Sequence, residues 1–194
     1  MHTVSIRSAV IAAAVVVGSI STVACTTTKP ETSSAQRSDS TTLHTRVNTT
    51  LQRLYETAPG SREMVQRARG VLVFPTVIGG SFVVGVEHGR GELLIGSHVR
   101  GEYTTTAASI GWQAGGQSKA VIYVFNTQEA LDKFLKSDGW AVGADATVAA
   151  GRIGANGSVD STSYDAPVSS YVLTNAGLEA GVALGGSKIT RVTK

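Results

Sequence analysis

The residues able to do metal or covalent chemistry are few in this 194-residue chain, and they are widely spaced. Beyond the first 25 residues the only histidines are His44, His88 and His98. The last two would face each other across a hairpin turn predicted at residues 87–92, which would make a thin metal site. A structural zinc site needs four ligands, and two histidines do not supply them. We therefore predict exposed hairpin side chains here and no metal ligand.

Motifs for catalysis and nucleotide binding are also missing. The sequence has no Gly-x-Ser-x-Gly elbow, and no spacing selects a Ser, His and Asp set. Asp145, Asp160 and Asp165 are better explained as turn caps than as a carboxylate pair. Gly79-Gly80 precedes a strand pattern, and Leu94 stands where a dinucleotide fingerprint needs its third glycine. We predict no enzyme, no catalytic residue and no cofactor, which leaves a binding or structural role.

Basic residues gather where the folded part of the chain is expected to begin. This region contains five of the chain's arginines and only two acidic residues, Glu56 and Glu63, so it is about three charges positive. The chain as a whole carries a formal net charge of +3. No dense Lys/Arg cluster indicates a nucleic-acid partner. An arginine on the border of an apolar helix face can reach lipid headgroups, at about 1 kcal/mol per basic residue near an anionic membrane. The candidate headgroup-binding residues are Arg46, Arg53, Arg62, Arg67 and Arg69. The alternative is a solvated face on a helix that packs against a sheet.

The first 25 residues have the order of a bacterial secretion signal. A positive charge, an apolar run too short to span a bilayer, and small residues precede Cys25, the only cysteine. This end resembles a bacterial lipobox, which implies cleavage before Cys25 and lipidation of that residue. Thr26, in place of Asp, implies forwarding to the outer membrane. Ordinary secretion with a free thiol is the alternative.

Hydrophobic spacing predicts two helices and then a sheet. Residues 26–42 are small and polar, which favours a flexible tether. Apolar residues then recur at helical spacing from Leu43 to Ala58, and a second short helix begins at Ser61 and stops at Gly70. Arg46 and Arg53 lie on one border of the first helix's apolar stripe.

Beyond Gly70 the pattern is mostly β, with glycine-containing turns that include "EHGRGE" at residues 87–92. One helix interrupts it, with Asn126 as its cap and Glu129 reaching back. The buried side of this helix is expected to contain Ala130, Leu131, Phe134 and Leu135. We predict an α+β fold with a mainly antiparallel sheet or barrel-like core, two N-terminal helices and one inserted helix.

From about Leu43 to Lys194 the chain resembles the SYLF domain family. The resemblance is carried by "ARGVLVFPTV", "FVVGVEHGRGELL", "YTTTAASIGWQAGGQSKAVIYVFNTQEALDKF", "GANGSVDS" and "APVSSYVLTNAGLEAGVALGGSKIT", in that order. It implies binding of anionic lipids, phosphoinositides in eukaryotic members, with basic residues near the start of the domain contributing. Some eukaryotic members also bind actin filaments.

Together these features predict a signal peptide at 1–24, a lipidated Cys25 with a tether to residue 42, and a SYLF-like domain at 43–194. The expected function is a lipid-anchored protein of the bacterial envelope that binds anionic phospholipids or phosphoinositides. The alternative is a structural or partner-binding lipoprotein, with actin or a host protein as partner by family analogy.

Overall fold

Three helices and nine strands make up the described part of the chain. The computed structural model describes residues 32–80, 84–110, 117–145, 147–151, 159, 165–179 and 186–193. The helices are α1 (Thr32–Thr57), α2 (Ser61–Arg67) and α3 (Gln128–Lys136). The strands are β1 (Gly70–Gly80), β2 (Val84–Ile95), β3 (His98–Ile110), β4 (Gln117–Phe125), β5 (Trp140–Ala141), β6 (Val148–Ala150), β7 (Val168–Thr174), β8 (Gly177–Glu179) and β9 (Ser187–Arg191).

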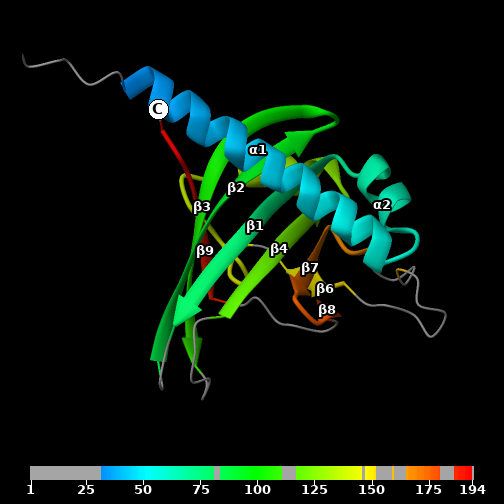
Figure 1. The fold of residues 1–194 in the computed structure, drawn as a ribbon. Coiled ribbons are helices and arrows are strands. Elements are labelled where there is room, and N and C mark those ends of the chain that lie inside the picture. Colours follow the sequence, from blue (N-terminus) through cyan, green and yellow to red (C-terminus); the bar gives the residue numbers. More distant parts are fainter. Residues whose placement is uncertain are drawn as a thin grey trace, which may run out of the picture. The chain divides into compact units, whose positions relative to one another are not determined.

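All nine strands belong to one curled sheet, and α1 lies across one of its faces (Figure 1). Its order is β5-β9-β3-β2-β1-β4-β7-β6, with β8 paired to β7. Every pairing is antiparallel except that of β6 with β7. The predicted α+β fold with a mainly antiparallel sheet, two N-terminal helices and one inserted helix is confirmed.

The central strands are buried on both faces, which explains their unbroken apolar runs. In β1, Val71 and Val73 pack under α1, whereas Leu72 and Phe74 face the opposite core. That second core holds most of the buried aromatic side chains and is covered by α3. Both cores lie within the compact unit Ser33–Lys194. No helix in the described residues is long and apolar enough to cross a bilayer.

Helix α1 begins earlier than the sequence indicated. It starts at Thr32, so the part of the predicted tether from residue 32 to residue 42 is helical. The polar composition that favoured a tether has another use here, because Asp39 bonds to Arg90 and Ser40 to Glu102 on the sheet. These contacts anchor the first turns of the helix although they bury little apolar surface.

The "EHGRGE" stretch is not a turn, because β2 runs through it without a break. Its glycines allow β2 to lie close to the backbone of β1. A side chain at Gly89 would meet the Thr76 carbonyl oxygen at 2.8 Å, and one at Gly91 would overlap the Val73 carbonyl oxygen. The turn lies instead after β2, where Gly96 has a φ of 60°, a value that favours glycine.

The predicted cap of α3 was off by one residue. Thr127 is the N-cap, and its hydroxyl accepts the amide N–H of Ala130. Asn126 instead donates its side-chain amide to the Ala166 carbonyl at 2.7 Å and to Ser169 Oγ at 3.1 Å. Asn126 therefore holds α3 to the start of β7. The buried side of the helix is as predicted, with Leu131 and Phe134 in the core and Ala130 and Leu135 packed against it.

Tyr123 makes the stability of the core sensitive to alkaline pH. Burial raises the pKa of this phenol well above its ordinary value of 10.0, although a hydrogen bond with Ser187 acts in the opposite direction. The folded state therefore favours the neutral phenol. Its stabilising effect is complete below pH 10 and is lost as the pH rises toward the folded-state pKa, at up to about 1.4 kcal/mol per pH unit.

We expect Tyr123→Phe to reduce this loss, because Phe keeps the edge-to-face contacts with Phe74 and Trp140 and has no proton to release. Urea unfolding between pH 9 and pH 11 measures it. Equal pH slopes for the two proteins would show that Tyr123 does not titrate as described.

Candidate functional site

One edge of α1 carries two cations that no carboxylate in the described residues neutralises. Arg46 Nη2 donates to the Thr76 hydroxyl, and Arg53 Nη2 donates to the Thr174 carbonyl. Both acceptors are uncharged, so neither positive charge is compensated by the group that accepts its hydrogen bond. Arg46 is exposed and Arg53 is half-buried. We call this pair the basic edge of α1, and it lies on the border of the buried stripe as the spacing predicted.

The other three predicted arginines lie elsewhere. The guanidinium of Arg62 is 4.3 Å from the centre of the Tyr55 ring, and Tyr55 projects from the opposite edge of α1 because it is two residues beyond Arg53. Arg67 pairs with Glu63 at 2.6 Å, one turn away on α2. The side chain of Arg69 is exposed, and its backbone N–H donates to the Phe125 carbonyl. The structure thus separates the five arginines, and Arg67 has an acidic partner.

Exposed apolar side chains lie on the same sheet face, beyond the basic edge. Ile78 is 61% exposed and Val86 is 64% exposed. Ile78 stands opposite His88 in the register, and Val86 stands opposite Gly80, so the two share the face that carries Thr76. Arg46, Ile78 and His88 line one open cavity of about 230 Å³. We call Ile78 and Val86 the apolar tip.

Two buried glutamates lie on the sheet under the N-terminal half of α1. Glu92 and Glu102 are directly opposite each other on β2 and β3, with exposed fractions of 2% and 8%. Like charges in this position repel unless cations or hydrogen bonds compensate. Arg90 bridges Glu102 at 3.0 Å and Asp39 of α1 at 2.7 Å. The hydrogen bond with Asp39 raises the pKa of Arg90 most, and the hydrogen bond with Glu102 acts in the same direction.

The same carboxylates bind α1 directly. The Ser40 hydroxyl donates to Glu102 at 2.7 Å, and His44 Nδ1 lies 2.8 Å from Glu92 Oε2. Asn48 extends the chain of contacts, with Nδ2 3.1 Å from His44 Nε2. We call the residues joined by these contacts the polar network. They are Asp39, Ser40, His44, Asn48, Arg90, Glu92 and Glu102. The network fixes where α1 lies on the sheet. It therefore also positions the basic edge.

A known family matches the C-terminal part of the chain. Residues 106–194 fit the family model described as Ysc84: Las17-binding protein actin regulator. Residues 106–194 are therefore similar to the Ysc84 (SYLF) domain family. This confirms the resemblance seen in the sequence and associates the chain with a family of actin-associated or lipid-binding proteins. No curated protein matches the chain.

The matched segment begins within β3 and covers β4, α3 and the later strands of the sheet. The basic edge, the apolar tip and the polar network all lie before it in the sequence. The sequence analysis did not predict that Glu92 and Glu102 lie on the α1 face, because it assigned residues 87–92 to a turn. One signal was available. Glu92 lies two residues before the inward-facing Leu94, and residues two apart in a strand share a face.

The histidines do not converge within the described part of the SYLF domain. His88 stands opposite Thr106 and His98 opposite Ile95, so the two do not face each other, and both are exposed as predicted. The described residues contain no group of three or more His, Cys, Asp or Glu side chains suited to a metal ion. Signal peptide 1–24, Cys25 and Asp160 lie outside the described residues.

Proposed function

We propose that the chain is a lipid-anchored protein of the bacterial envelope, held at the outer membrane through Cys25. Its SYLF domain binds anionic phospholipids without covalent chemistry. The observation that carries the proposal is the basic edge: Arg46 and Arg53 bond only to uncharged oxygens, and Arg46 lines one cavity with the exposed side chain of Ile78. Phosphoinositides are the more specific candidate ligands.

The physical basis is the one used by proteins that lie at a membrane interface. Guanidinium groups form paired hydrogen bonds with phosphate oxygens, and each basic residue near an anionic surface contributes about 1 kcal/mol. Ile78 and Val86 would enter the boundary between headgroups and acyl chains, where burial of apolar area adds to the attraction. A lipid anchor at Cys25 would keep the domain near the membrane and raise its effective concentration there.

Arg46→Gln combined with Arg53→Gln tests the proposed surface. We expect binding to anionic vesicles to weaken about thirtyfold, because two uncompensated charges are lost at about 1 kcal/mol each. The measurement is co-sedimentation of residues 26–194, which contain the compact unit and lack Cys25, with phosphatidylglycerol-containing vesicles. Vesicles with a phosphoinositide in place of phosphatidylglycerol test headgroup preference.

Arg67→Gln is the matched control. It removes the same charge from an exposed helix, but Glu63 already neutralises Arg67, so vesicle binding should stay within about twofold of the parent. Loss of binding in this control together with full binding in the double variant would overturn the proposed surface.

The family description favours a second candidate, a protein partner. It names a Las17-binding protein and actin regulator, which makes actin or a host protein the partner to test. Residues 26–194 would then sediment with actin filaments, and Arg46→Gln with Arg53→Gln would leave that binding unchanged. Sedimentation with vesicles alone favours the lipid function.

A further inference from the structure

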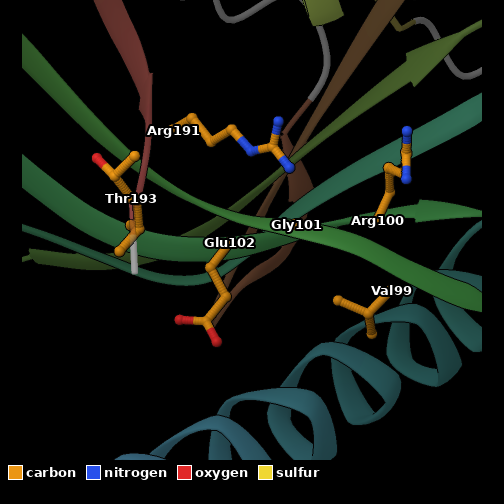
Figure 2. Close-up of a pocket in the computed structure, with 7 residues that line it drawn as sticks. Val99, Arg100, Gly101, Glu102, Arg191 and Thr193 are labelled. Atoms are coloured by element: carbon orange, nitrogen blue, oxygen red, sulfur yellow. The ribbon is translucent and has the colours of Figure 1, made fainter.

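A second group of arginines lies on the other side of β3, away from α1. Arg100 and Arg191 line an open cavity of about 410 Å³, and the other lining residues are Val99, Gly101, Glu102, Val192 and Thr193. In Figure 2 both guanidiniums project from the side of β3 opposite to α1, whereas Glu102 and Val99 point toward the helix. The cavity is therefore separate from the basic edge.

The backbone register supports this placement. Arg191 stands opposite Tyr103, and Tyr103 belongs to the core that α3 covers. Its neighbour Glu102 faces α1 and bonds to Arg90 and Ser40. The carboxylate nearest in sequence is thus engaged on the α1 side of the sheet and does not neutralise the arginines.

Both arginines are exposed, and neither forms an ion pair with a carboxylate in the described ranges. They also lie near one phenol. Burial raises the pKa of Tyr103, while the positive charges of Arg191 and then Arg100 act in the opposite direction. Two like charges held together without a counter-charge create a strongly positive site.

Gly101 lies next to one of these cations. A β-carbon at position 101 would lie 3.4 Å from Arg191 Nε and 3.4 Å from Tyr103 Cε2. The guanidinium of Arg191 thus lies against the strand at the one position without a side chain. The Thr193 side chain lies beside the same cavity and carries a hydroxyl donor (Figure 2).

We propose that Arg100 and Arg191 form a second anion site, which binds a phosphate group on the sheet face opposite to α1. The two guanidiniums supply the donors that phosphate oxygens accept, and guanidinium matches phosphate in paired hydrogen bonds. The phosphate belongs to a lipid headgroup or to a free phosphate compound. The chemistry of recognition is the same for both sources.

The test compares two double variants. The first carries Arg100→Gln and Arg191→Gln, and the second carries Arg46→Gln and Arg53→Gln. Binding of glycerol 3-phosphate and inorganic phosphate to residues 26–194 is followed by NMR titration at constant ionic strength, and vesicle binding is measured with phosphatidic acid. We expect the first double variant to weaken phosphate binding at least about tenfold and the second to leave the soluble probes unaffected. Thermal unfolding of each variant confirms that it is folded.

Each outcome decides the proposal. Saturable binding of a soluble probe that requires Arg100 and Arg191 supports a site for free phosphate compounds. Binding of phosphatidic acid vesicles alone, lost in the same variant, supports a headgroup site. If the folded Arg100 and Arg191 variant binds all three probes as the parent does, or the parent binds none, the second site does not exist. The basic edge keeps its own test, because its variant leaves this cavity intact.

Discussion

Gly91→Ala should destabilise the domain by about 4 kcal/mol, a large part of the 5–15 kcal/mol that holds a typical domain together. The added methyl would overlap the Val73 carbonyl oxygen and lie 2.6 Å from Phe74 Cδ1. Both atoms belong to β1, which is paired on both sides by β2 and β4 and cannot move aside. Urea unfolding gives the free energy of unfolding directly.

Gly101→Ala is the matched control for this prediction. It places the same methyl group in the same sheet, but the nearest atoms are 3.4 Å away and belong to side chains, which is an ordinary contact. Its effect should stay below about 1 kcal/mol. If Gly91→Ala is as stable as Gly101→Ala, the close approach of β1 and β2 is not as described. If Gly91→Ala fails to fold while the control folds, the close approach is supported.

Arg90→Met should be the second most damaging change, at about 2 kcal/mol. It removes the cation between Asp39 and Glu102 while two buried carboxylates still face each other on β2 and β3. Breaking a buried ion pair commonly costs about 3–5 kcal/mol, and we expect less because the Arg90 side chain is 44% exposed. The first turns of α1 should exchange their amide hydrogens faster, since Asp39 and Ser40 lie there.

A double-mutant cycle separates the ion pair from simple loss of packing. Arg90→Met combined with Glu102→Met removes both charges, so the double variant should be more stable than Arg90→Met alone. Additive destabilisation by the two changes would contradict the network, as would an unchanged rate of amide exchange in α1.

Much of the fold follows from local patterns. The buried stripe of α1, with Leu43, Val47, Leu51 and Leu54, follows from helical spacing and is present in the structure. The buried side of α3 is likewise correct. The sequence could not reveal why Gly91 is a glycine, because the reason is the backbone of a strand eighteen residues earlier. A pattern that is read locally places such glycines in turns.

The candidate site was predictable to a smaller degree. The border position of Arg46 and Arg53 depends only on the seven-residue spacing, which brings two residues back to nearly the same angle on a helix. The Glu63 partner of Arg67 also follows from local spacing, because the two residues are one helical turn apart on α2. The Tyr55 partner of Arg62 depends on how α2 lies beside α1, which local patterns do not give. The polar network depends on the register of β2 with β3 and on the position of α1, so it emerged only in three dimensions.

The central claim is that the domain recognises negative charge on a lipid surface through the face that carries Arg46 and Arg53. The most direct measurement is co-sedimentation of unmodified residues 26–194 with neutral vesicles and with anionic vesicles, each at low and high salt. We predict binding to the anionic vesicles only, and a decline as salt screens the attraction. Equal binding to both kinds of vesicle, or to neither, would contradict the account.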